Sequence, residues 1–147
     1  MKKLILIVVS AAILLLSLEG TSLANDPFIR ISTEPDEVVL STIPGSSGTG
    51  RYSSLTVNVE SNCTHGAIVV SITPLKMKGK LFTVPRERIS VIAPTTSDFV
   101  PLSKSVTISK TQTGSHEIPL TFRVDASFDD YAGKYEGTIA FTVMPPA

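Results

Sequence analysis

The sequence has no tryptophan, one cysteine and two histidines among its 147 residues. A single thiol cannot form an intramolecular disulfide, so any folded domain must be held together by packing alone. The histidines, His65 and His116, lie far apart in the sequence, and neither has partners at the spacing of a metal site. A structural zinc site takes four nitrogen or sulfur ligands, and a catalytic site takes three. We therefore expect no metal and no cofactor.

The sequence leaves two environments open for Cys63, the one cysteine. It is either buried as a small hydrophobic side chain or exposed as a thiol that can pair with another molecule. It lies two residues before His65, and a thiol and an imidazole in contact can act as nucleophile and base. Because nothing else in the sequence supports such a pair, we interpret both as unrelated loop residues.

The chain also has no excess of charge of either sign, since 13 Lys and Arg residues balance 13 Asp and Glu residues. A near-neutral chain lacks the basic excess that marks nucleic-acid binding. No Gly-x-Ser-x-Gly motif of a serine hydrolase occurs. Asp125, Asp129 and Asp130 lack the spacing of a calcium loop, so we interpret them as turn residues, with weak calcium binding as the alternative. These absences predict a protein that is not an enzyme and does not bind nucleic acid.

The one long hydrophobic run stands at the N-terminus, behind two lysines. Residues 4–16 are apolar except for Ser10, and small residues stand at Ser22 and Ala24. The run is shorter than the roughly 20 residues that a membrane-spanning helix needs. This layout predicts a secretory signal peptide, residues 1–24, that is cleaved after Ala24, with an uncleaved anchor as the alternative.

Removal of the signal peptide leaves residues 25–147, with 123 residues, 11 basic and 12 acidic side chains and a net charge of about −1. This length is typical of a single domain with a full hydrophobic core. No later segment is long and apolar enough to span a membrane. We expect an exported protein, in the periplasm, at the cell surface or secreted, with no membrane span after cleavage.

Apolar and polar residues alternate through most of residues 25–147. Alternation places successive side chains of a strand on opposite faces, so one face is buried. Strands are expected at residues 28–33, 37–42, 55–60, 67–73, 81–84, 88–92, 106–109, 118–125 and 135–143. Seven to nine short strands with turn residues between them predict an all-β fold, an antiparallel β-sandwich.

Three prolines carry positional information about these strands. Pro119 interrupts a strong strand pattern, which favours an edge strand, a bulge or the first turn of the strand. Pro27 and Pro35 flank the first strand of the domain, which suggests that it is an edge strand or switches sheets. The Gly- and Ser-rich residues 45–50 predict a loop.

From Tyr131 the chain reads Tyr-Ala-Gly-Lys-Tyr-Glu-Gly-Thr-Ile-Ala-Phe-Thr-Val. This stretch resembles the closing strand of exported bacterial immunoglobulin-like (Ig-like) sandwiches of the spore-coat-U and pilin-like type, and residues 54–63 are similar to an early core strand of the same domains. The resemblance implies an Ig-like sandwich. It implies a turn at Ala132 and Gly133, and a closing strand with Gly137 in which Tyr135 buries its ring while its hydroxyl bonds to the backbone.

The sequence departs from chaperone–usher pilins at two points. Such pilins usually carry a disulfide pair and an aromatic residue next to the C-terminus, whereas this chain has Cys63 alone and Pro146. They also donate an N-terminal strand, and only a short lead precedes the first strand here. A free-standing accessory or surface domain therefore fits better than a polymerising pilin.

The sequence predicts a non-enzymatic exported structural or protein-interaction domain at the bacterial cell envelope, such as an accessory or subunit of a pilus-like assembly. Its interaction element is expected to be an exposed sheet edge that accepts or donates a strand, for a protein partner or for self-association. The candidate interaction strand carries Phe28, Ile29 and Ile31.

The alternative function is a module that binds carbohydrate or another envelope polymer. It would use Tyr52 or Tyr131 with a basic docking surface in the segment 76–88. That surface comprises Lys76, Lys78, Lys80, Arg86 and Arg88. The simpler interpretation of these cations is a solvated edge strand that positive charge protects against edge-to-edge pairing.

Overall fold

Strands make up nearly all of the regular structure in the computed structural model, which describes residues 3–7, 26–41, 48–49, 52–127, 130–131 and 133–146. In these ranges the one helical element is the short 3-10 helix η1 (Arg86–Arg88). The predicted all-β class is confirmed. The predicted cleavage site at Ala24 and the turn residue Ala132 lie outside the described residues, and the loop predicted over residues 45–50 is described only at β4 (Gly48–Thr49).

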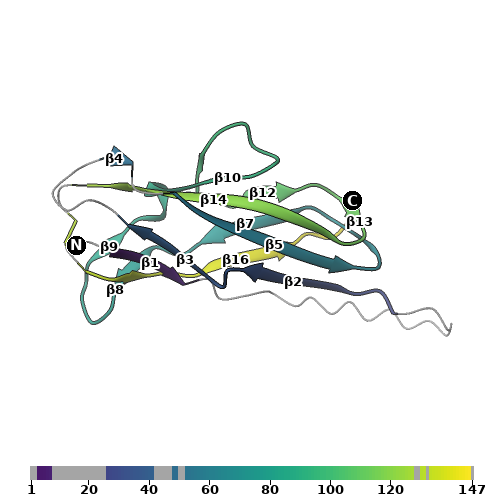
Figure 1. Cartoon of the computed structure of the whole chain (residues 1–147), viewed down its shortest axis with the longest axis horizontal. Coiled ribbons are helices and arrows are strands. Elements are labelled where there is room, and N and C mark those ends of the chain that lie inside the picture. Colours follow the sequence, from purple (N-terminus) through teal and green to yellow (C-terminus); the bar gives the residue numbers. More distant parts are fainter. Residues whose placement is uncertain are drawn as a thin grey trace.

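The first layer is a sheet in the order β11-β10-β14-β5-β2, in which every neighbouring pair is antiparallel. Its strands are β2 (Ile29–Glu34), β5 (Ser53–Ser61), β10 (Ile89–Ile92), β11 (Val100–Pro101) and β14 (His116–Ala126). The two-residue β4 pairs with the end of β14. The long ladder between β5 and β14 runs through the middle of this layer and fixes its register (Figure 1).

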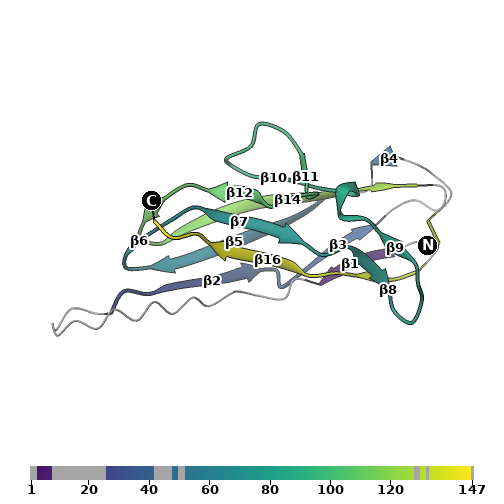
Figure 2. The ribbon, with the colours of Figure 1, turned by 180° about the vertical axis from the view of Figure 1, so that it is seen from behind.

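The second layer combines two ladders, in the orders β12-β7-β16 and β3-β1-β15-β8-β9. Its strands are β1 (Lys3–Ile7), β3 (Glu37–Ser41), β7 (Ile68–Ile72), β8 (Leu75–Met77), β9 (Thr83–Val84), β12 (Val106–Ser109), β15 (Tyr135–Glu136) and β16 (Ile139–Val143). Thr73 N donates to Thr138 O at 3.0 Å, and Thr138 N donates to Thr73 Oγ1 at 2.9 Å. Thr73 lies between β7 and β8, and Thr138 lies between β15 and β16. Their hydrogen bonds therefore join the two ladders into one layer (Figure 2).

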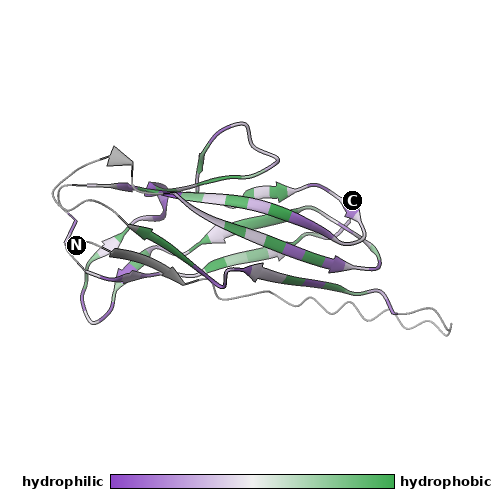
Figure 3. Cartoon of the chain, viewed as in Figure 1, coloured by the Kyte–Doolittle hydropathy of each residue, from purple (hydrophilic) through white to green (hydrophobic). Residues whose placement is uncertain are grey.

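One hydrophobic core lies between the two layers. On β5, Leu55, Val57 and Val59 are buried and alternate with polar residues that are more exposed. Figure 3 shows the same alternation of hydrophobic and hydrophilic residues along β14. The buried residues of β14 are Ile118, Leu120, Phe122 and Val124. The period-two pattern of the sequence therefore identified the face that each of these strands buries.

The predicted strands match the structure closely, and β12 has the bounds expected from the sequence. With the short antiparallel pair β6 (Thr64–His65) and β13 (Gln112–Thr113), the described part contains sixteen strand segments rather than seven to nine, because long strands are interrupted and several ladders have only two residues. The predicted strand over residues 135–143 is broken at Gly137, where a Cβ would lie 2.5 Å from Leu75 Cδ2. β8 was not among the strands expected from the sequence.

The prolines around β2 mark both features that the sequence suggested. β2 lies at the edge of the first layer, and after Pro35 the chain enters β3 in the second layer. Pro119 lies on β14, which is an inner strand, so an edge strand was the wrong expectation there. However, β10 accompanies β14 only from Thr121 to Val124, and Pro119 pairs with Thr56 of β5 on one side alone. The missing N–H of the proline is therefore tolerated.

Candidate functional site

The second layer is continuous only because β1, a strand from the N-terminal segment, lies within it. β1 pairs with β3 antiparallel from Lys3–Ser41 to Ile7–Glu37, and it meets β15 in parallel at Leu4–Tyr135. In the part of the chain that the structure describes, β3 and β15 have no ladder with each other. We name the space that β1 fills between them the strand slot (Figure 1).

The β3 wall of the strand slot has one apolar face toward the core. Val38 and Leu40 are fully buried, whereas Val39 between them is 50% exposed. Cross-strand partners share a face of the sheet. The partners of Val38 and Leu40 are Leu6 and Leu4, and the partner of Val39 is Ile5. Positions 4 and 6 of the slot strand are therefore the ones opposite the buried residues of β3.

The β15 wall is built around Tyr135, whose side chain is buried. Its hydroxyl donates to the carbonyl of Tyr131 at 3.0 Å, as the sequence resemblance implied. Burial raises the pKa of the Tyr135 phenol above its ordinary value of 10.0, because the charged phenolate would lose its solvation. Two residues earlier, a Cβ at Gly133 would lie 2.5 Å from Met77 Cε, so a side chain there would require the flexible end of Met77 to shift.

Replacing Tyr135 by phenylalanine is expected to change how stability depends on alkaline pH. The Tyr135→Phe protein loses one hydrogen bond and should be less stable by about 1 kcal/mol at pH 7. The raised pKa of Tyr135 in the folded state means that its stabilisation is complete below pH 10.0 and is lost as pH rises through the folded-state pKa. Urea unfolding from pH 7 to pH 11 should therefore show the two proteins converging, and a constant difference would contradict this reading.

Arg88 holds the turn beside Tyr135 and is not a free cation of the docking surface. Its Nη1 donates to Asp130 Oδ1 at 2.8 Å, and its Nε donates to the Asp125 carbonyl at 2.8 Å. The bonds to Asp130 raise the pKa of the guanidinium. Asp130 also accepts from Ser127 N at 2.8 Å, in keeping with a turn role, while Asp129 lies outside the described residues.

The other cations of the docking surface are exposed. Lys76 lies on β8, Lys78 and Lys80 follow in the turn to β9, and Arg86 lies on η1. Leu81 in the same turn is 99% exposed. Its neighbour Phe82 stacks on Tyr131 with ring centroids 3.7 Å apart. Tyr131, one of the two tyrosines expected in a polymer-binding site, therefore lies beside the β8–β9 turn.

The second tyrosine of that prediction lies elsewhere, on the first layer. Tyr52 stacks on Phe99 with ring centroids 5.4 Å apart, and the Arg123 guanidinium lies 4.5 Å from the centre of the Phe99 ring. Phe99 leads into β11, Arg123 lies on β14, and Tyr52 directly precedes β5. The structure therefore divides the proposed polymer-binding residues between two separate places.

The candidate interaction strand forms the open edge of the first layer. Phe28 is 44% exposed, whereas Ile31 is buried and Ile29 is partly buried against the core. Asn62 holds the start of this strand, because Phe28 N donates to Asn62 Oδ1 at 2.8 Å and Asn62 Nδ2 donates to Asp26 O at 3.0 Å. The strand is thus an integral part of its own sheet.

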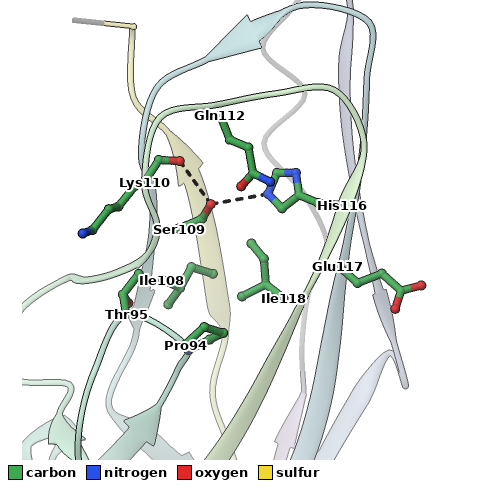
Figure 4. A pocket seen from close by; sticks show the side chains of 9 residues that line it. All are labelled: Pro94, Thr95, Ile108, Ser109, Lys110, Gln112, His116, Glu117 and Ile118. Carbon is green, nitrogen blue, oxygen red and sulfur yellow. Dashed lines mark hydrogen bonds between the residues drawn. The ribbon is translucent and has the colours of Figure 1, made fainter.

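A cleft of about 380 Å³ lies between β12 and β14 (Figure 4). Ser109 Oγ lies 3.4 Å from His116 Nε2 and 3.2 Å from the Lys110 carbonyl. A hydroxyl that donates its one proton to a carbonyl cannot donate it to the imidazole as well. Ser109 is also buried. In Figure 4 the Glu117 carboxylate points away from the contact between Ser109 and His116. The contact therefore lacks the geometry of an activated nucleophile.

His116 also stacks on His65, with ring centroids 5.2 Å apart. His65 is buried, and its Nδ1 lies 2.8 Å from the Gly66 carbonyl, so this nitrogen carries the proton. Cys63 is half-buried, with Sγ 3.5 Å from the Phe28 carbonyl, between the two environments that the sequence left open. Within the described ranges no three His, Cys, Asp or Glu side chains form a group that could hold a metal ion.

The sequence reasoning missed two of these arrangements. Ser109 and His116 flank the turn at Gly114, so a hairpin at that glycine would have suggested their contact. The strand slot had a weaker signal, because β1 was interpreted as part of a targeting segment. An apolar run of this kind does not show which strand it pairs with.

No family model matches this chain. No curated protein matches it either. Among the described residues, no helix has both the length and the apolar character needed to cross a membrane.

Proposed function

We propose that this protein is a non-enzymatic, exported structural or protein-interaction domain of the cell envelope that works by accepting a strand from outside its folded domain. The observation that carries the proposal is the position of β1. The only described strand that bridges β3 and β15 comes from residues 3–7, inside the segment whose composition predicts a cleaved signal peptide. Cleavage at Ala24 would leave the slot without its strand.

The order of the strands supports an Ig-like assignment. In an immunoglobulin sandwich, one sheet has the order A-B-E-D and the other has C-F-G. The first layer has β2, β5, β14 and β10 in the order A-B-E-D, and β7–β8 beside β15–β16 corresponds to C beside F. β1 lies next to F, in the place of strand G, but it runs parallel to β15, whereas G is antiparallel to F in an Ig sandwich.

An empty strand slot would be costly to the domain. Val38, Leu40 and Tyr135 border it and are buried while β1 is present. Exposing one large apolar side chain costs about 1.5–3 kcal/mol. The unpaired backbone groups of β3 and β15 would also template pairing with another strand. Strand addition at such an edge is a general mode of peptide recognition.

The proposal is tested by peptide binding to the processed protein, purified after export. A labelled peptide of residues 2–7 is titrated and followed by fluorescence anisotropy. We expect saturable binding that is lost when the peptide carries Leu4→Ser and Leu6→Ser. The matched control carries Ile5→Ser and Ile7→Ser at the positions paired with Val39 and Glu37, and it should still bind. Equal binding of both variants, or of neither, would contradict strand acceptance.

A polymer-binding module is the second candidate, and the stacking of Tyr131 on Phe82 beside exposed lysines favours it. Aromatic faces and cations together suit anionic polymers. Sedimentation with insoluble envelope polysaccharide should weaken with Tyr131→Ala and with Lys78→Glu and Lys80→Glu together, if this function is correct. Tyr52→Ala, at the other stacked pair, is the control. Unchanged sedimentation in all variants would exclude the hairpin of β8 and β9, with Lys78 and Lys80, as the polymer-binding site.

A further inference from the structure

After cleavage at Ala24 another strand would have to take the place of β1 in the strand slot. The positions of the other extended segments of the chain indicate where that strand comes from. This inference rests on the proposed function. The segment that enters the slot must meet three conditions. It must run antiparallel to β3 and parallel to β15, it must cover about the five residues of β3, and it must present large apolar residues at alternate positions.

The N-terminal segment of the processed chain is already in use. Cleavage after Ala24 would leave only residues 25–28 ahead of β2, fewer than a five-residue strand requires. β2 itself pairs with β5 from Ile29–Ser61 to Glu34–Thr56, and Asn62 holds the residues before it. In a second copy, β2 would have to leave this ladder and expose the buried Ile31 before it could enter the slot of a neighbour.

The segment after β16 leads away from the slot. Met144 N donates to the Ala67 carbonyl at 2.8 Å, and the backbone of residues 144–145 packs tightly on Gly66. Pro145 and Pro146 have no N–H to give to a ladder. Figures 1 and 2 place this end of the chain opposite the end where β1, β8 and β9 lie. Residues 42–51, by composition, have three glycines, a proline and no run of alternating apolar residues.

We propose that the strand slot of the processed protein is filled by a segment of a different polypeptide, and that this protein accepts a strand without donating one. The donor segment is extended, carries large aliphatic or aromatic side chains at alternate positions, and lies parallel to β15. The partner is therefore a second protein with an unpaired apolar strand, and two copies of this chain do not complete each other.

Photo-crosslinking in the organism that produces the protein tests this inference. A benzophenone amino acid replaces Val39, which is exposed on β3 and pairs with the middle of the slot strand. The control replaces Leu81, which is fully exposed on the β8–β9 turn away from the slot. We expect a crosslinked species from position 39 and none from position 81, and sequencing of its peptide should give a segment of another protein with alternating apolar residues.

Three results would overturn the inference, and they separate it from the proposed function. A crosslinked peptide from residues 25–34 of this chain would show that copies exchange β2. If no crosslink forms at position 39 although the free peptide binds in vitro, no outside strand occupies the slot in the cell. In both cases strand acceptance itself would stand. Failure of the free peptide to bind would remove the proposed function and this inference together.

Discussion

Joining the β1 sequence to the processed protein is expected to stabilise it by about 2–3 kcal/mol. The addition consists of a 20-residue Gly/Ser linker after Ala147 followed by Lys-Leu-Ile-Leu-Ile, so that the strand can reach the slot in the same molecule. The gain comes from covering Val38, Leu40 and Tyr135 again, at about 1.5–3 kcal/mol for each side chain, and the entropy of ordering the added strand offsets most of it. For a domain of this size the melting temperature should rise by roughly 10 °C.

Matched variants separate strand insertion from a nonspecific effect of the added residues. Serine at the two leucines of the added strand should abolish the stabilisation, because these positions pair with the buried Leu40 and Val38. Serine at the two isoleucines, which pair with the exposed Val39 and Glu37, should retain most of it. Equal melting temperatures for the two serine variants would show that the added strand does not enter the slot in this register.

Gly66→Ala is expected to have the largest effect among single substitutions outside the hydrophobic core. A Cβ at this position would overlap the carbonyl oxygens of Met144 and Pro145. Overpacking costs about 1–3 kcal/mol, and we expect the upper end of this range because the overlap is with backbone. Gly79→Ala is the control, since that site has open space and its cost comes from φ +71 alone.

The comparison is made by urea unfolding monitored by circular dichroism. The Gly66→Ala protein should lose about 3 kcal/mol, and the Gly79→Ala protein about 1 kcal/mol. The difference measures how firmly the segment after β16 is held at the end of the molecule opposite the strand slot. Equal losses in the two variants would mean that this segment moves aside easily, and it could then serve as a free strand.

The sequence predicted the strands far better than it predicted the slot. Alternation identified β5 and β12 because each strand buries one face, and this is recorded locally in residues such as Leu55 and Val57. The sheet switch at Pro35 was also visible locally. Whether β3 has a partner depends instead on which distant segment lies beside it, and no local pattern near Val38 or Leu40 carries that information.

The candidate site residues also divide into those whose role the sequence predicted and those whose role depends on distant partners. The backbone bond of the Tyr135 hydroxyl was expected because the stretch from Tyr131 resembles a known type of closing strand. Arg88 was grouped with the docking surface because its spacing resembled that of the nearby lysines. Its partner Asp130 lies 42 residues away, and only the tertiary fold brings the two side chains together.

Hydrogen exchange of the processed protein, with and without the peptide of residues 2–7, tests strand acceptance most directly. Strand acceptance predicts fast exchange of the β3 amides in the protein alone and strong protection of the same amides when the peptide is bound, because β1 is the one described strand that pairs with β3. The amides of β5 and β14 should exchange slowly in both states, because their ladder does not involve the slot. If the β3 amides are equally protected without the peptide, the slot is already closed and strand acceptance is wrong.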